Sequence, residues 1–192
     1  MAGLDEAGRG PLAGPVVAAA VILPSDFVCD GIGDSKALSA LGRERAYTVI
    51  MSNADAVGVG IVGPEDIDRV NILRATHMAM RAALSDLSAA LDFILVDGLP
   101  VPDLPAPSLA IVKGDSKSIS IMAASIVAKV TRDQMMLELD RQYPEYGFAS
   151  HKGYCTKEHL AAIDRHGPCR CHRKSFAPVA ERTANCRLPG LE

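Results

Sequence analysis

Long hydrophobic runs are missing from this chain of 192 residues. The longest one, residues 16–23, is too short to cross a bilayer, and the start of the chain has no apolar stretch of the signal-peptide type. Tryptophan is absent, and the odd number of cysteines, five, is typical of reduced thiols rather than of a disulfide framework. These absences argue against membrane-spanning and disulfide-rich secreted proteins. We expect a soluble, cytoplasmic monomer built around one core.

An excess of positive charge is also missing, since the formal net charge is -3. Domains that bind nucleic acid usually carry a basic face, so the total charge argues against such a partner. The distribution along the chain points the other way. Residues 113–192 contain thirteen Lys and Arg against nine Asp and Glu, whereas residues 1–112 contain seven against fourteen. The second part of the chain can therefore face an anion.

Three of the potential metal ligands lie close together in the sequence as Cys169, Cys171 and His172. Structural zinc sites usually have four ligands and a Cys-x2-4-Cys spacing. Here the spacing is tighter, and a fourth ligand would have to come from elsewhere, such as Cys155 or Cys186. The sequence therefore favours a turn with incidental thiols after Gly167-Pro168, and we expect no zinc.

Apolar runs that alternate with helical patterns predict an α/β domain. The expected strands cover the start of the chain up to Glu6 and residues 16–23, 56–63, 93–98 and 108–113; the expected helices cover residues 39–53, 64–87, 116–143 and 156–167. We expect the main domain to comprise residues 1–143, with a small helical C-terminal extension over residues 144–192.

The glycine-rich segment GRGPLAG, residues 8–14, has some likeness to the phosphate-binding loop of dinucleotide-binding proteins. That loop opens a helix, with its glycines at set positions. Here the glycine spacing differs, and Pro11 and the strand over residues 16–23 stand where the helix should begin. The sequence therefore argues against a dinucleotide site.

Four carboxylates follow apolar strands and should lie at the rim of the sheet, where ligands bind in open α/β folds. They are Asp5, Glu6, Asp97 and Asp115. Like charges that crowd in this way need a cation, and carboxylate oxygens suit Mg2+ or Mn2+. Two such ions would stabilise the attacking and leaving oxygens of a phosphoryl displacement. The spacing leaves open that Asp115 only caps a helix, or that the enzyme is a phosphatase or another metal-dependent enzyme.

Small polar and basic groups in the expected loops are candidate substrate ligands. Two glycines let the backbone approach a ligand closely, an arginine or lysine can hold phosphate, and an exposed tyrosine ring can stack on a sugar or base. Each group taken alone is more typical of a solvated loop. The candidates are Gly8, Arg9, Gly10, Lys36, Lys117, Lys152 and Tyr154.

Seven stretches occur in the order found in the type 2 ribonucleases H, and over nearly its whole length the sequence resembles that family, ribonuclease HII. The stretches are GLDEAGRGPLAGPVVAAAVIL, GDSKALS, NILRATHMAM, ILVDG, VKGDSKSISIMAASIVAKVTRD, YGFASHKGYCTKEH and HRKSFAPV.

The resemblance implies an RNase H-like fold with a central mixed five-stranded sheet flanked by helices. It also implies a divalent-metal endonuclease, with two ions during catalysis, that cuts the RNA strand of RNA–DNA hybrids. Incision 5′ of a single ribonucleotide in duplex DNA, leaving 5′-phosphate and 3′-hydroxyl ends, is implied as well. A hybrid-binding module without catalysis is the alternative, and the clustered acids argue against it because they would repel phosphate.

The roles of individual residues follow from the same resemblance. The four catalytic and metal-binding acids of the family fall on Asp5, Glu6, Asp97 and Asp115. The loop that reads the 2′-hydroxyl falls on residues 8–10, and the tyrosine that stacks on the sugar at the ribose–deoxyribose junction falls on Tyr154. Lys36, Lys117 and Lys152 are expected to hold phosphates.

Overall fold

The computed structural model describes residues 1–28 and 39–185. Five strands form one mixed sheet in the order β3-β2-β1-β4-β5. Strand β1 (Ala2–Ala7) is central, antiparallel to β2 (Val16–Ile22) and parallel to β4 (Ile94–Asp97). The outer strands are β3 (Ala56–Val62), antiparallel to β2, and β5 (Ser108–Ile111), parallel to β4. The expected mixed five-stranded sheet is confirmed.

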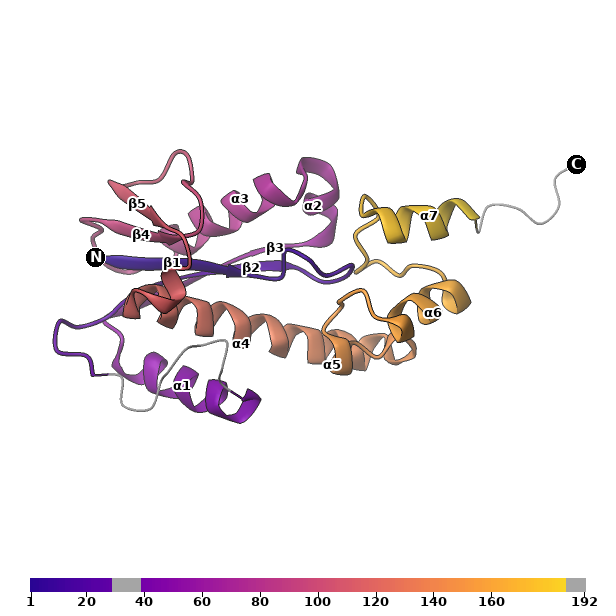
Figure 1. Cartoon of the computed structure of the whole chain (residues 1–192), viewed down its shortest axis with the longest axis horizontal. Coiled ribbons are helices and arrows are strands. Elements are labelled where there is room, and N and C mark those ends of the chain that lie inside the picture. Colours follow the sequence, from indigo (N-terminus) through magenta and orange to yellow (C-terminus); the bar gives the residue numbers. More distant parts are fainter. Residues whose placement is uncertain (29–38, 186–192) are drawn as a thin grey trace, which may run out of the picture.

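Helices cover both faces of the sheet (Figure 1), which accounts for the continuously apolar sequence of β2. Every residue of β2 is buried. Helix α4 (Ile119–Gln142) packs on one face, with α1 (Ala40–Asn53) beyond it, and α3 (Ile72–Ser85) packs on the other face. Helix α4 approaches β1 so closely that a Cβ on Gly3 would lie 2.1 Å from the carbonyl carbon of Ser120.

The helix expected over residues 64–87 is two helices, so that prediction was wrong. Helix α2 (Pro64–Val70) ends at Asn71, and α3 starts at the next residue. Asn71 has a φ of 72°, and its side chain accepts a hydrogen bond from the Arg74 amide. The Asn71 side chain caps the start of α3, so it separates the two helices inside a continuous apolar pattern without a proline or glycine.

The helix expected over residues 116–143 starts later, at Ile119, after a short 3-10 turn, η1 (Gly114–Ser116). The helix expected over residues 156–167 is present as α6 (Lys157–His166). The other elements after α4 are the 3-10 turn η2 (Pro144–Tyr146) and helices α5 (Phe148–His151) and α7 (Ala177–Asn185).

These C-terminal elements lie at the end of the molecule opposite the N-terminus (Figure 1). Their own apolar cluster includes Tyr146 and Phe148, whose rings stack at 5.4 Å, and it reaches Leu12 and Ala13 of the loop between β1 and β2. The extension therefore supports that loop. In the part of the chain that the structure describes, no helix is long and apolar enough to cross a membrane.

Candidate active site

The sheet topology brings the four acids to the carboxyl end of three neighbouring parallel strands, β1, β4 and β5. Asp5 and Glu6 stand next to each other on β1, and the parallel neighbour β4 ends at Asp97. The Gly114 amide of η1 donates a hydrogen bond of 2.6 Å to Asp97 Oδ1, and the buried Asp115 follows directly. Because β1, β4 and β5 run parallel, their carboxyl ends meet there. Carboxylates distant in sequence thus share one rim.

Burial makes this rim unfavourable for negative charge. Asp5 is only 5% exposed, and burial, the neighbouring Glu6 and Asp97 together raise its pKa to about 8. Hydrogen bonds from the Ser125 side chain and the Glu6 amide (2.7 Å to Asp5 Oδ1) oppose the rise. Burial also raises the pKa of Glu6, against the ion pair with Arg9 at 3.1 Å. A bound cation would relieve this penalty, so the donor set fits a hard divalent ion.

The four acids do not form a closed three-ligand cluster. Among residues 1–28 and 39–185, one group of three His, Cys, Asp or Glu residues has donor atoms that all lie within 4.8 Å of one another, and it is Cys169, Cys171 and His172. The more widely spaced carboxylates leave room for more than one ion.

Replacing Asp5 by asparagine is expected to stabilise the metal-free protein at neutral pH. Because the pKa of Asp5 is raised from 3.8 to about 8, the folded state binds the proton more tightly than the unfolded chain does. The free energy of unfolding should therefore fall as the pH rises from about 4 toward 8. Asparagine removes this fall, and we expect it to raise the free energy of unfolding by about 1–2 kcal/mol at about pH 7.

Urea unfolding in EDTA, at about pH 5 and about pH 7.5, measures this effect. Asp92→Asn, at an exposed position before β4, is the matched control and should leave the pH dependence unchanged. Equal pH dependence for wild type and Asp5→Asn would contradict the prediction. Saturating Mg2+ should restore most of the wild-type stability at the higher pH, because a bound cation favours the ionised cluster.

A cleft of about 310 Å³ leads from Glu6 to two of the expected substrate-binding residues. Its lining includes Glu6, Gly8 and Tyr154. The sequence prediction missed four polar side chains of the lining, namely Arg43, Ser125, Lys129 and Arg132. The cleft thus brings Tyr154 to Glu6 and Gly8, which lie far from it in the sequence.

Buried Arg173 holds the glycine-rich loop. Its guanidinium donates hydrogen bonds to the carbonyl oxygens of Gly8 at 2.6 Å, Arg9 at 2.9 Å and Gly14 at 3.0 Å. A fully buried arginine needs partners of this kind, because its charge is otherwise costly to desolvate. Arg173 lies in HRKSFAPV, one of the stretches that carry the resemblance, but nothing local in that stretch indicates its partners.

Arg132 of α4 supports the same loop from the other side. Its Nε donates to the Pro15 carbonyl oxygen at 3.0 Å, and one terminal nitrogen donates to the carbonyl oxygens of Ala13 at 3.2 Å and Lys152 at 3.1 Å. These bonds tie the loop to the segment that carries Tyr154. Two buried arginines therefore position the loop that the sequence identified only by its glycines.

Tyr154 lies beside this loop with an exposed ring. A Cβ on Gly10 would be 3.8 Å from Tyr154 Cε1, and the tyrosine side chain is 47% exposed. The backbone of Tyr154 is fixed at both ends. Its amide donates to the His151 carbonyl oxygen at 2.9 Å, and its own carbonyl oxygen contacts His159 Nδ1 at 2.8 Å. An open ring on a fixed backbone suits stacking on a substrate.

The structure does not place Lys117 or Lys152 in the lining of the cleft. Lys117 donates to the Val112 carbonyl oxygen at 2.8 Å, and Lys152 donates to that of Ala149 at 2.6 Å. Lys152 lines a separate hollow of about 110 Å³ with Asp133. Lys36 lies outside the described residues. Phosphate binding by these three lysines stays a prediction.

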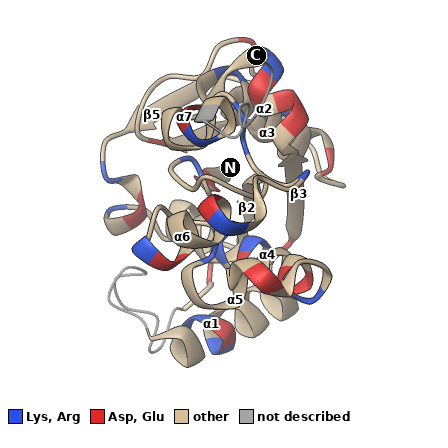
Figure 2. Cartoon of the chain, turned by 90° about the vertical axis from the view of Figure 1, so that its right-hand side faces the viewer, with Lys and Arg blue, Asp and Glu red and all other residues tan. Residues whose placement is uncertain are grey.

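The excess of basic residues after residue 112 does not form a uniform surface. Figure 2 looks onto the end of the molecule that carries α5, α6 and α7, and it shows basic and acidic residues interspersed on the helices there. The positive side chains that line the cleft are Arg43, Lys129 and the buried Arg132. Local placement therefore matters more for this site than the regional charge.

Comparison with known proteins agrees with this geometry. The sequence model of the ribonuclease HII family matches residues 2–179. Ribonuclease HII of Bacillus thuringiensis (strain Al Hakam) is 57% identical over 181 residues, which cover 94% of this chain and 70% of that protein.

Solved structures share the fold. Ribonuclease H2 from Pyrococcus horikoshii OT3 superposes with a TM-score of 0.80 at 28% identity, over 97% of this chain and 98% of that chain. Bst-RNase HIII in complex with Mn2+ superposes with a TM-score of 0.74 at 19% identity, over 97% of this chain and 70% of that chain. The chain belongs to the ribonuclease HII family of ribonuclease H enzymes.

Proposed function

We propose that the chain is a divalent-metal-dependent endoribonuclease that cuts the RNA strand of RNA–DNA hybrids. We also propose that it incises 5′ of a single ribonucleotide embedded in duplex DNA. The observation that carries this proposal is that Asp5, Glu6 and Asp97 lie together at the carboxyl ends of the parallel strands β1 and β4. Asp115 lies beside them. A cleft joins Glu6 to Gly8 and Tyr154.

Asp5, Glu6, Asp97 and Asp115 would hold Mg2+ or Mn2+. When bound, the cations stabilise charge on the attacking and leaving oxygens and lower the pKa of the attacking water. The chain's own contribution is a rigid carboxylate frame, because Asp5 is buried on a central strand and Asp97 is fixed by the Gly114 amide. No protein nucleophile is needed, and hydrolysis would leave 5′-phosphate and 3′-hydroxyl ends.

The glycine-rich loop would recognise the ribose. RNA differs from DNA by its 2′-hydroxyl, which both donates and accepts hydrogen bonds. The loop of Gly8, Arg9 and Gly10 offers backbone groups at close range, and Arg173 fixes its carbonyls. Contacts to the backbone and sugar carry no base information, so we expect little sequence preference.

The test is a product map on a DNA duplex that carries one ribonucleotide. Cleavage should occur 5′ of the ribonucleotide with Mg2+ or Mn2+, stop in EDTA, and weaken as the salt concentration rises. An all-DNA duplex of the same sequence and a phosphomonoester serve as controls. Binding without turnover would support a hybrid-binding module instead, and cleavage of either control would indicate another metal-dependent enzyme.

Tyr154→Ala is expected to weaken discrimination at the ribose–deoxyribose junction. The alanine removes the exposed ring beside Gly10, and loss of one stacking contact corresponds to about a tenfold loss in kcat/KM on the single-ribonucleotide duplex. Tyr154→Phe keeps the ring and is the control. Cleavage kinetics on that duplex and on a uniform hybrid measure the effect. A wild-type pattern for Tyr154→Ala would refute the stacking role.

A further inference from the structure

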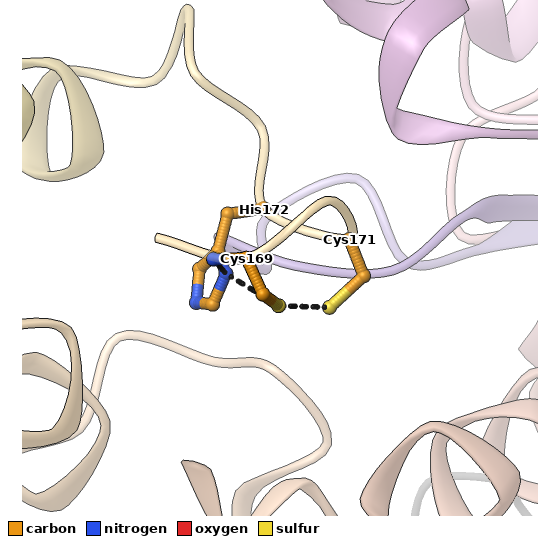
Figure 3. Close-up of side chains that lie close together, drawn as sticks. All are labelled: Cys169, Cys171 and His172. Atoms are coloured by element: carbon orange, nitrogen blue, oxygen red, sulfur yellow. Dashed lines mark hydrogen bonds between the residues drawn. The ribbon is translucent and has the colours of Figure 1, made fainter. Parts of the chain in front are cut away.

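A second group of potential metal ligands lies in the turn between α6 and α7, outside the cleft. Figure 3 shows the side chains of Cys169, Cys171 and His172 pointing toward one another. The two sulfur atoms are 3.0 Å apart, and Cys169 Sγ is 3.1 Å from His172 Nδ1. Cys171 and His172 are buried, and Cys169 is half-buried. Two soft sulfur donors and one imidazole nitrogen therefore share a small, mostly buried space.

A chain of hydrogen bonds determines the tautomer of His172, that is, which of its ring nitrogens carries the proton and which has the free lone pair. His159 Nδ1 lies 2.8 Å from the Tyr154 carbonyl oxygen, which only accepts, so this nitrogen carries a proton. The Nε2 atoms of His159 and His172 are 3.0 Å apart, so one of them must donate. The Cys169 amide donates a hydrogen bond of 3.0 Å to His172 Nδ1, so Nδ1 is an acceptor and His172 Nε2 is that donor. The lone pair of neutral His172 is then on Nδ1, toward the cysteines.

This arrangement has the features of a zinc site. Zinc takes thiolate sulfur and imidazole nitrogen, and a ligating histidine usually donates its other N–H to a neighbouring acceptor. His159 supplies that acceptor. Tetrahedral bond lengths place such ligand atoms about 3.5–3.8 Å apart, so the donors need to separate by about 0.4–0.8 Å. Zinc would also displace the hydrogen bond of 3.0 Å from the Cys169 amide to Nδ1.

Cys171 also borders a hollow that gives access and room for a fourth ligand. The hollow has a volume of about 330 Å³, and its lining includes Gly14, Pro15 and Leu139. Water from this side could complete the coordination, so a fourth cysteine is not required. The tight Cys-x-Cys spacing argued against zinc in the sequence. In the fold His172 Nδ1 lies beside the two sulfurs. Three protein ligands are therefore close together despite the tight spacing of the two cysteines.

We propose that Cys169, Cys171 and His172 bind one Zn2+ ion, with water as the fourth ligand. Binding releases one proton from each thiol and uses the Nδ1 lone pair of His172. The site is chemically distinct from the carboxylate rim, which prefers hard cations. Its hydrogen-bonded partners lead from His172 through His159 to the backbone of Tyr154. The ion would therefore stabilise the segment that presents the tyrosine ring.

Zinc binding to the full-length chain tests the proposal. The protein is reduced with a phosphine, stripped with a chelator, loaded with Zn2+ in the presence of excess Mg2+, and passed through a desalting column. We expect one zinc per chain for wild type and for the control Cys155→Ser, whose thiol is exposed and outside the cluster. The double variant Cys169→Ser/Cys171→Ser should bind zinc at least about 100-fold more weakly. Loss of a residue that only hydrogen-bonds to a metal ligand typically costs about 10–100-fold in affinity.

Two measurements on the wild-type chain keep the test decisive if the double variant does not fold. Zinc should protect two of the five thiols from alkylation, and Co2+ in place of Zn2+ should give a thiolate charge-transfer absorption. Equal zinc affinity for wild type and double variant overturns the proposal. So does a reduced wild-type chain that retains no zinc and shows no cobalt–thiolate band, whether its thiols stay free or pair as a disulfide on air oxidation.

Discussion

Asp97→Asn is expected to lower Mg2+-dependent cleavage of the single-ribonucleotide duplex by about a thousandfold or more. The bound metal contributes several kcal/mol of transition-state stabilisation, and this contribution depends on each carboxylate that holds the metal. A loss of about 4 kcal/mol corresponds to three orders of magnitude in rate. Asparagine removes one negative charge yet keeps an oxygen that can accept the Gly114 amide hydrogen bond. The turn that carries Asp115 should therefore stay in place, so the loss would report on chemistry rather than on folding.

The measurement is single-turnover cleavage with saturating enzyme, paired with circular dichroism and thermal unfolding. Asp92→Asn changes the same residue type at an exposed position a few residues earlier and should cleave like wild type. Near-normal cleavage by Asp97→Asn would refute the assignment of the metal site. A lowered melting temperature in that variant would instead show that the Gly114 bond had been lost, and Asp5→Asn would then be the cleaner probe.

The position of the acids could be predicted from the sequence because it depends on local signals. Apolar runs mark the strands, and a carboxylate at the end of a run lies at a sheet edge whatever the rest of the fold does. Asp5, Glu6 and Asp97 were found in this way without any knowledge of which strands are neighbours. The pairing of β1 with β4, which brings them together, is a property of the topology.

The supports of the glycine-rich loop could not be predicted in this way. Arg132 and Arg173 are fully buried, although arginine is among the residues most often found at the surface. Their carbonyl partners lie between 117 and 165 residues away for the bonds to Pro15, Ala13 and Gly8, so no local pattern indicates them. The break at Asn71 was missed for a related reason, since a single residue with positive φ leaves the apolar periodicity unchanged.

Gly8→Ala is expected to destabilise the protein by about 3 kcal/mol or more and to abolish specific cleavage. Gly8 has a φ of 95°, where a side chain is strained. An added Cβ would lie 2.1 Å from Arg132 Nε and 2.8 Å from the Pro15 carbonyl oxygen. Arg132 cannot swing aside without giving up its hydrogen bonds to three backbone carbonyls, which would leave buried polar groups unpaired.

Gly10→Ala is the matched control two residues along the same loop. Among the atoms of residues 1–28 and 39–185, a Cβ there would meet only Tyr154 Cε1 within 4 Å, at an ordinary contact distance of 3.8 Å. We expect Gly10→Ala to unfold at nearly the wild-type urea concentration, and Gly8→Ala to unfold at a much lower one. Equal stability of the two variants would mean that Arg132 does not hold the loop. If Gly8→Ala folds yet loses preference for the ribonucleotide, the loop geometry, rather than the carboxylate rim, determines where the strand is cut.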